Sequence, residues 1–326
     1  MSDAPAIDLL AIGETLVDFI SIEPAGSLAR ADTFRRHLGG SPANIAVNMA
    51  RLGMRTAVIS KTGAGAFGQF LERQLNRHGV QTDYLVMDPH VRTSFIFIAR
   101  TSGTPDFEPR RNGDYKLTPG DVPPEAIARA RIVHASAFAL SRPPCRMAVG
   151  KAFQLAAQYG KIVSLDPNYS PVIWPDYEEA RQVIGEMFRY ATITKASLDD
   201  ARRFFGAKEK PETYLEMLHE LGPQTVVLTM GREGALLWHG GRLRGHLPAR
   251  PLTVADATGA GDAFWAGYLT AMLDGHPPER CLLFAREVAE RKLAAVGPLP
   301  APLNRAELYA RLPEPSAALK PFHAST

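Results

Sequence analysis

The chain has 326 residues, of which 45% are hydrophobic and 22% charged, so it can form one large domain or two ordinary ones. A net charge of +3 gives no argument for nucleic acid or an anionic membrane, and no apolar run approaches the roughly 18 residues of a membrane helix. Cys145 and Cys281 lack metal-ligand spacing, and the N-terminus lacks a signal-peptide pattern. We therefore expect a cytoplasmic protein.

Short apolar runs and amphipathic segments alternate along the chain. We expect strands at Ile7–Ile12, Thr56–Ser60, Ile132–His134, Ile162–Asp166, Ala191–Thr194 and Thr225–Met230. We expect helices at Pro42–Leu52, Phe67–His78, Gly261–Leu273 and Glu279–Val296. This alternation predicts an α/β fold whose mostly parallel central sheet is covered by helices on both faces.

Two stretches interrupt this alternation. Asp18–Glu23 follows the first strand without an intervening helix, and Thr93–Arg100 alternates its side chains before a polar hairpin candidate at Thr101–Arg111. These stretches predict a small β lid that covers a site. We expect a single domain over residues 1–326, with the lid inserted at about 14–37 and 90–118.

Asp256-Ala-Thr-Gly-Ala-Gly-Asp-Ala-Phe264 follows a strand-like segment, Leu252–Val254, and opens a helix. Gly259, Ala260 and Gly261 leave the backbone bare, so their N–H groups can point together at an anion. A phosphoryl group in transfer needs such donors. Asp262 is placed to accept a proton from an attacking hydroxyl. The alternative is a tight turn in which Asp262 only favours the helix dipole.

A second motif, Gly39-Gly-Ser-Pro-Ala-Asn-Ile-Ala-Val-Asn-Met-Ala-Arg-Leu-Gly53, lies near the N-terminus. Gly39 and Gly40 allow a ligand to approach the backbone closely. Pro42 can begin a helix, and Asn44 can offer a donor and an acceptor to a hydroxyl-rich ligand. Helix capping alone is the alternative interpretation.

Together the two motifs resemble the signatures of the ribokinase-like (PfkB) carbohydrate kinases, and the resemblance extends to about Pro300. It implies a three-layer α/β/α fold with about eight central strands and a small β lid. It also implies ATP and Mg²⁺ as cofactors, a small sugar as substrate, and a homodimer through the lid. The expected reaction is phosphorylation of a primary hydroxyl, first of a ketohexose such as fructose. A 2-keto-3-deoxygluconate or related sugar-acid kinase, a nucleoside kinase and a catalytically idle sugar sensor are the alternatives.

The resemblance assigns roles residue by residue. Asp262 matches the catalytic base, while Gly259, Ala260 and Gly261 match the anion hole. Positions that hold the acceptor correspond to Asp18, Gly39, Gly40 and Asn44. Asp256 and Thr258 match part of a monovalent-cation site, for K⁺, in some members.

Further positions match the nucleotide side. Ser197 and Asp200 stand where the family has an Asn-x-x-Glu motif, and Asp200 is expected to reach Mg²⁺ through water. Thr229, Gly231 and Gly234 resemble the Thr-Leu-Gly-x-x-Gly segment that approaches the phosphates or ribose. Gly297 lies where the adenine loop is expected. Plain capping at Ser197 and a simple turn after Thr229 are the alternatives.

The acceptor is less well defined. Arg111 matches an arginine in the lid of fructokinases and 2-keto-3-deoxygluconate kinases, although a solvated basic loop is the alternative. Asn168 lies in a segment that resembles Asp-x-Asn-x-Arg-x-x-x-Trp of the same groups, but Ser170 replaces the arginine. Gly63-Ala-Gly-Ala-Phe-Gly68 is a literal Gly-x-Gly-x-x-Gly, which alone is weak support for a dinucleotide-dependent oxidoreductase.

Overall fold

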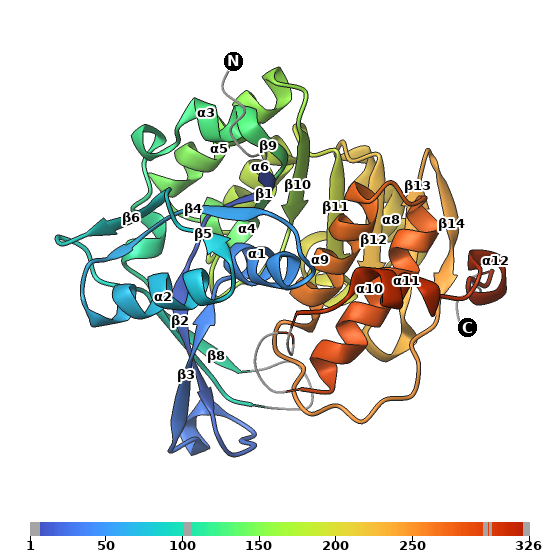
Figure 1. Ribbon diagram of the computed structural model, residues 1–326, viewed down its shortest axis with the longest axis horizontal. Helices are drawn as coiled ribbons and strands as arrows, with labels where there is room; N and C mark the ends of the chain where they lie inside the picture. Colours follow the sequence, from blue (N-terminus) through green and yellow to red (C-terminus); the bar gives the residue numbers. More distant parts are fainter. Residues whose placement is uncertain (1–6, 101–105, 296–298, 300–301, 322–326) are drawn as a thin grey trace.

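The computed structural model describes residues 7–100, 106–295, 299 and 302–321. Its centre is a ten-stranded sheet in the order β14-β13-β12-β11-β10-β9-β1-β4-β5, with β6 paired to β4 (Figure 1). All pairings from β12 to β5 are parallel, whereas β13 and β14 are antiparallel additions at one edge. The strands are β1 (Ile7–Ile12), β4 (Thr56–Gly63), β5 (Val80–Gln81), β6 (Leu85–Asp88), β9 (Ala130–Ser136), β10 (Ile162–Asp166), β11 (Ile193–Ser197), β12 (Thr225–Thr229), β13 (Ala235–His239) and β14 (Arg242–Leu247).

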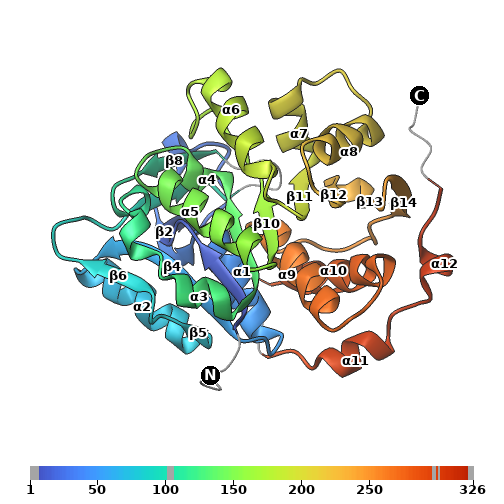
Figure 2. The same cartoon turned by 90° about the horizontal axis from the view of Figure 1, so that it is seen from above.

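Helices cover both faces of this sheet and close two hydrophobic cores. Figure 2 shows α7 and α8 on one side of β11 and β12, with α9 and α10 on the other. One face carries α3 (Pro124–Arg129), α4 (Ala137–Leu140), α5 (Cys145–Gln158), α6 (Tyr177–Phe188), α7 (Leu198–Phe205) and α8 (Pro211–Glu220). The opposite face carries α1 (Ser41–Arg51), α2 (Ala66–Arg77), α9 (Ala260–Leu273), α10 (Pro278–Leu293) and α11 (Arg305–Ala310). The short α12 (Pro315–Ala318) follows near the C-terminus.

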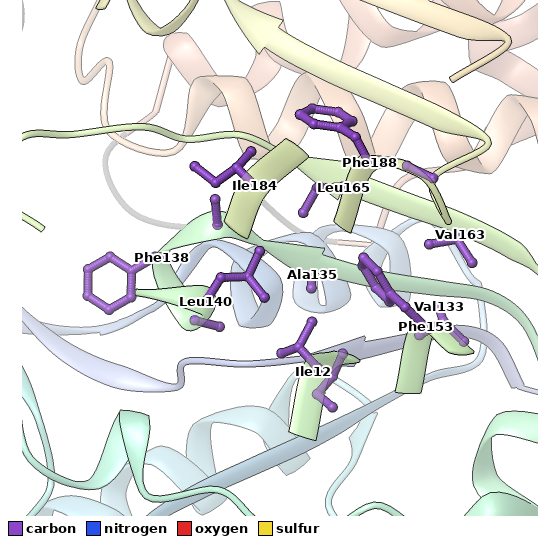
Figure 3. Close-up of a cluster of buried hydrophobic side chains, with 14 of the residues drawn as sticks. Ile12, Val133, Ala135, Phe138, Leu140, Phe153, Val163, Leu165, Ile184 and Phe188 are labelled. Carbon is purple, nitrogen blue, oxygen red and sulfur yellow. The ribbon is translucent and has the colours of Figure 1, made fainter. Parts of the chain in front are cut away.

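Alternate residues of the parallel strands point to opposite cores because side chains change face at each position. In β1, Leu10 and Ile12 enter the core under α5 and α6, whereas Leu9 and Ala11 enter the core under α1 and α9. Figure 3 shows Ile12 with side chains of β9, β10, α5 and α6 in the first of these cores. Burial on both faces explains why these strands appear in the sequence as short continuous apolar runs.

A second sheet of four strands, in the order β3-β2-β7-β8, forms the lid. Its strands are β2 (Leu16–Ser21), β3 (Phe34–Gly39), β7 (Phe95–Ile98) and β8 (Phe107–Arg110). β2 follows β1 directly, pairs antiparallel with β3 and parallel with β7, and projects away from the central sheet in Figure 1. The expected separate sheet is therefore present, and its first strand, β2, directly follows the central strand β1.

The fold agrees with the sequence-based expectation in class and in most elements, and three details are corrected. The segment Leu252–Val254 is not a strand but an unpaired loop, in which both named residues are exposed. Phe34–Gly39 is a lid strand that the residue pattern did not indicate, and the central sheet is larger than the expected eight strands. Within the ranges that the structure describes, no helix is both long and apolar enough to span a membrane.

Candidate active site

The predicted base, Asp262, lies in the first turn of α9. Gly259 is the N-cap residue and has φ +73°, in the left-handed region that favours glycine. The first intrahelical bond runs from Ala263 N to Gly259 O, and Ala260 N–H donates to Ala257 O at 3.2 Å. The amides of Gly261 and Asp262 precede the helix's own bonds and are available to an anion.

Two side chains of α1 hold the Asp262 carboxylate. Ser41 Oγ donates to Oδ1 at 2.8 Å, and Asn44 Nδ2 donates to Oδ2 at 3.0 Å. Burial raises the pKa of Asp262, while the charge of Lys195 and these two hydrogen bonds oppose the rise. The two sequence motifs thus meet at one carboxylate, as a shared site requires.

Asp18 lies on β2, beside the Asp262 carboxylate. Burial, and next the negative charge of Asp262, raise the pKa of Asp18 to about 7. A Cβ on Gly39 would lie 2.3 Å from the Asp18 carboxyl, and one on Gly40 would lie 2.3 Å from Glu14 O. Gly40 also has φ +97°. Both glycines are therefore required by the close packing of backbone and carboxylate around the acceptor side of the site.

A buried ion pair borders the first turn of α9 from the central sheet. Lys195 Nζ on β11 lies 2.7 Å from Asp166 Oδ2, and both side chains are almost fully buried. The ammonium also lies 3.2 Å from where a Gly261 Cβ would stand. Burial opposes the charged form, but the carboxylates of Asp166 and Asp262 outweigh it and raise the pKa of Lys195. A fixed positive charge therefore lies next to the helix amides that are available to an anion.

Asp256 lies in the loop that leads into α9. Its Oδ1 accepts from Thr258 N at 2.9 Å, and its Oδ2 lies 3.4 Å from Lys292 Nζ, with both side chains at most 5% exposed. Burial acts to raise the pKa of Asp256, but the Thr258 amide and Lys292 together lower it. Asp18, Asn44, Gly259 and this pair line one cavity of about 150 Å³.

A family model described as pfkB family carbohydrate kinase matches residues 6–301. The chain belongs to this family. It is a carbohydrate kinase, a phosphotransferase that acts on an alcohol group.

Three known proteins show how this PfkB kinase compares with its relatives. An ATP-dependent 6-phosphofructokinase of Thermoanaerobacterium thermosaccharolyticum is 34% identical over 90% of each chain. The Halothermothrix orenii fructokinase structure is 38% identical, with a TM-score of 0.77, over 89% of this chain and 99% of that one. A double mutant of Vibrio cholerae fructokinase, solved with fructose, ADP and a potassium ion, is 25% identical with a TM-score of 0.82, over 95% and 100%. Their shared ribokinase-like fold agrees with the sheet and helices described above.

The residues predicted to bind the nucleotide lie at the ends of two adjacent strands of the PfkB kinase, where Ser197 is in register with Thr229. Ser197 and Asp200 form a capping box at the start of α7, with Ser197 Oγ donating to Asp200 Oδ2 at 2.6 Å and Asp200 N donating to Ser197 Oγ at 3.0 Å. Burial, and next the charge of Asp166, raise the pKa of Asp200 to about 6. Capping alone accounts for these bonds, and a role toward Mg²⁺ stays a prediction.

Glycines on the nucleotide side have different surroundings. Gly231 has φ +56° and no heavy atom within 4 Å of an added Cβ, so nothing in its packing demands glycine. Gly234 has φ +98°, and its Cβ would lie 2.0 Å from Leu247 O, so packing against β14 demands it. Gly297 lies outside the described residues.

The two residues predicted to bind the acceptor differ in how many contacts hold their side chains. Arg111 is held by an ion pair with Asp114, by a 2.6 Å bond to Ser141 Oγ and by the ring of Phe138. Asn168 has φ +32° just after β10, a strained conformation that is common at binding sites. Its backbone N–H donates to Asp166 Oδ1 at 3.0 Å.

The Gly63–Gly68 segment has a packing explanation. It joins β4 to α2, and a Cβ on Gly68 would lie 1.7 Å from Gly63 O. One on Gly63 would lie 2.6 Å from Val91 O. These glycines let a helix and a loop pack closely on the end of β4, which needs no dinucleotide.

Sequence reasoning did not single out Ser41, Lys195, Lys292 or Glu14. Glu14 Oε1 accepts from Ser136 Oγ at 2.8 Å and from Ser41 N at 3.2 Å, so it fixes the start of α1 under the site. Burial raises the pKa of Glu14 to about 8. A local signal was the lysine inside the otherwise buried strand Ile193–Ser197. In the described part of the chain, no group of three or more His, Cys, Asp or Glu side chains is arranged to hold a metal ion.

Proposed function

We propose that the kinase transfers the γ-phosphoryl group of ATP to a primary hydroxyl of fructose. The observation that carries this proposal is the contact of Asp262 with Ser41 and Asn44, beside free helix amides and the Lys195 ammonium. A base, an anion site and an acceptor pocket are thereby joined in one place. The fructokinases of Halothermothrix orenii and Vibrio cholerae support fructose as the acceptor.

In this mechanism Asp262 accepts the proton of the attacking hydroxyl through a carboxylate oxygen. Ser41 and Asn44 orient the carboxylate, and Asp18 and Asn44 bind acceptor hydroxyls from the lid and from α1. The amides of Gly261 and Asp262, with Lys195, stabilise the negative charge on the moving phosphoryl oxygens. Closure of the lid excludes water, which would otherwise be an acceptor.

The nucleotide is placed along the ends of β11 and β12. Thr229, Gly231 and Gly297 would contact its phosphates or ribose and adenine, and Gly234 would shape the turn. Asp200 would hold Mg²⁺ through water, because its buried carboxylate faces the same strand ends as Asp166. Mg²⁺, when bound, neutralises charge on the phosphate oxygens.

The test is ADP release with a panel of acceptors: fructose, other ketohexoses, aldoses, fructose 6-phosphate, 2-keto-3-deoxygluconate and nucleosides. Fructose should give the highest kcat/KM. Asp262→Asn should lower kcat about 10²–10⁴-fold, the usual contribution of a positioned base, while fructose binding measured by calorimetry persists. Near-normal turnover of this variant would refute the base assignment, and fructose binding without ADP release from any acceptor would favour an idle sensor.

A phosphorylated sugar is the second candidate acceptor. A cavity of about 430 Å³ beside lid strand β8 is lined by Arg92, Arg110, Arg111 and Arg142, with no acidic residue among its described lining. Arg92 and Arg142 have exposed side chains, so an anionic group could pair with them. The Thermoanaerobacterium relative is named as a 6-phosphofructokinase. If fructose 6-phosphate exceeds fructose in the panel and the double variant Arg92→Gln/Arg142→Gln loses only that preference, this candidate replaces fructose.

The homodimer expected through the lid also belongs to this proposal. One lid face carries partly exposed rings of Phe19, Phe34, Phe95 and Phe97 in mutual contact, and such a surface is suited to a second copy. Light scattering after size exclusion should give about twice the monomer mass of 35.5 kDa. A cytoplasmic location stays a prediction from the two unpaired, buried cysteines.

A further inference from the structure

The Asp256 loop is where some family members place a monovalent cation, and its surroundings here differ from what such a cation needs. A buried carboxylate is either paired with a cationic side chain or coordinates a metal ion. Asp256 is 6% exposed, and one of its carboxylate oxygens is occupied by the Thr258 amide. The remaining oxygen, Oδ2, already faces an ammonium group.

That ammonium belongs to Lys292, in the last turns of α10. Lys292 is 4% exposed, so its charge is not solvated like that of a surface lysine. Its Nζ lies 3.4 Å from Asp256 Oδ2, and its Cε lies 3.9 Å from where a Cβ on Gly259 would stand. Burial lowers the pKa of Lys292, while the carboxylates of Asp256 and Asp262 oppose that change and favour the ammonium form. The ammonium therefore lies between the buried carboxylate and the N-cap of α9.

Backbone bonds hold α10 and the Asp256 loop together. Ala255 N donates to Leu293 O at 2.8 Å, one residue beyond Lys292. The helix end and the loop are thus fixed side by side, and the lysine side chain has little freedom to leave. A second cation beside a fixed ammonium would be repelled by a like charge in a poorly solvated place.

We propose that the Lys292 ammonium replaces the monovalent cation in this enzyme, holding the Asp256 loop so that Gly259 and the free amides of α9 keep their arrangement. Lys292 is a positioning residue in this role, since it acts through the loop. The activity measurement that tests this inference rests on the proposed phosphoryl transfer, whereas the measurement of Tm does not depend on it. It predicts a kinase whose activity is independent of K⁺.

The experiment compares K⁺, Na⁺ and tetramethylammonium chlorides at equal ionic strength. For the wild-type enzyme, kcat/KM for the best acceptor should change less than about twofold, and Tm without substrates should not depend on the cation. Lys292→Met keeps the length of the side chain and removes the charge. In tetramethylammonium it should lose at least about tenfold in kcat/KM, because a buried carboxylate is left unpaired. K⁺ should restore part of that loss and raise the variant's Tm.

Two further variants separate the role of the charge from that of the fold. Lys292→Arg keeps a cation and should remain insensitive to K⁺, whereas Lys208→Met, at an exposed position, should behave as wild type. Activation of the wild type by K⁺ of about tenfold or more, or a K⁺-specific rise in its Tm, would overturn the proposal. So would a fully active Lys292→Met that ignores K⁺. If Lys292→Met does not fold, the wild-type and Lys292→Arg titrations decide, and a protein without kinase activity is still judged by the Tm series.

Discussion

Replacing Ser41 with alanine tests whether its hydrogen bond lowers the pKa of Asp262, the proposed base. Ser41 Oγ donates to Asp262 Oδ1 at 2.8 Å, and this bond stabilises the charged carboxylate. A hydrogen bond to a charged group contributes about 1.5–3 kcal/mol, and about 1.36 kcal/mol corresponds to one pKa unit. Ser41→Ala should therefore raise the pKa of Asp262 relative to wild type. The acidic limb of the kcat/KM profile should move to higher pH, and on that limb kcat/KM at a fixed pH should fall about 10- to 100-fold.

The assay is ADP release with fructose from pH 5 to 9, at low acceptor concentration so that the rate reports kcat/KM. Ser316→Ala, at an exposed position in α12, is the matched control and should leave the profile unchanged. Because Asp18 and Asp262 interact, the limb belongs to the pair of carboxylates. Asp18→Asn removes the like charge and should move the limb downward. A Ser41→Ala profile that superimposes on the wild-type profile would refute the assignment of Ser41 as a partner of the ionised base.

Two further predictions concern packing and stability. Gly39→Ala places a Cβ 2.3 Å from the Asp18 carboxyl, so KM for the acceptor should rise at least about tenfold while KM for ATP stays near wild type. Gly26→Ala, with no atom within 4 Å, is its control, and equal acceptor KM values for the two variants would contradict the close contact. The pKa of Glu14, raised to about 8, means that the native state binds more protons than the unfolded state. Stability from this group is complete below about pH 4.5 and decreases by up to about 1.4 kcal/mol per pH unit as the pH rises toward 8. Glu14→Gln should reduce that slope in urea unfolding at pH 5 to 8, and unchanged slopes would contradict a neutral buried acid.

The elements that sequence reasoning located correctly are those whose signals are local. Ile7–Ile12 is six consecutive residues buried on both faces, and its expected and observed bounds agree. The expected helix Phe67–His78 differs from α2 by one residue at each end. Phe34–Gly39 was missed because an edge strand of a solvent-facing lid has no continuous apolar run. It is a strand because it pairs with β2, and that pairing cannot be read from its own six residues.

The site was predictable only where a motif contained its own chemistry. The glycine-rich turn and Asp262 occupy adjacent positions, so an anion site there could be predicted from residue types alone. The contact between Ser41 and Asp262 joins residues 221 positions apart, and no local pattern predicts it. Lys292 lies three residues after Ala289 on the buried face of α10, and only the fold shows that it pairs there with Asp256. Sequence motifs of this kind identify candidate site residues, whereas the electrostatics of the site depend on tertiary contacts that the motifs do not contain.

The carboxylates around the site fall into two groups that differ in their partners. Asp166 and Asp256 are each paired with a lysine, so their charges are compensated before any ligand arrives. Asp262 instead accepts hydrogen bonds from Ser41 and Asn44, and burial together with the charge of Asp262 raises the pKa of Asp18 to about 7. Because the interaction between two charges is mutual, an ionised Asp18 also makes Asp262 a stronger base. In the proposed mechanism this repulsion would be relieved when Asp262 takes the acceptor proton, so proton transfer would be favoured as the hydroxyl attacks. In the proposed mechanism the lysines would hold the loop and the phosphoryl anion, while burial raises the pKa of Asp262 and so favours its role as the general base.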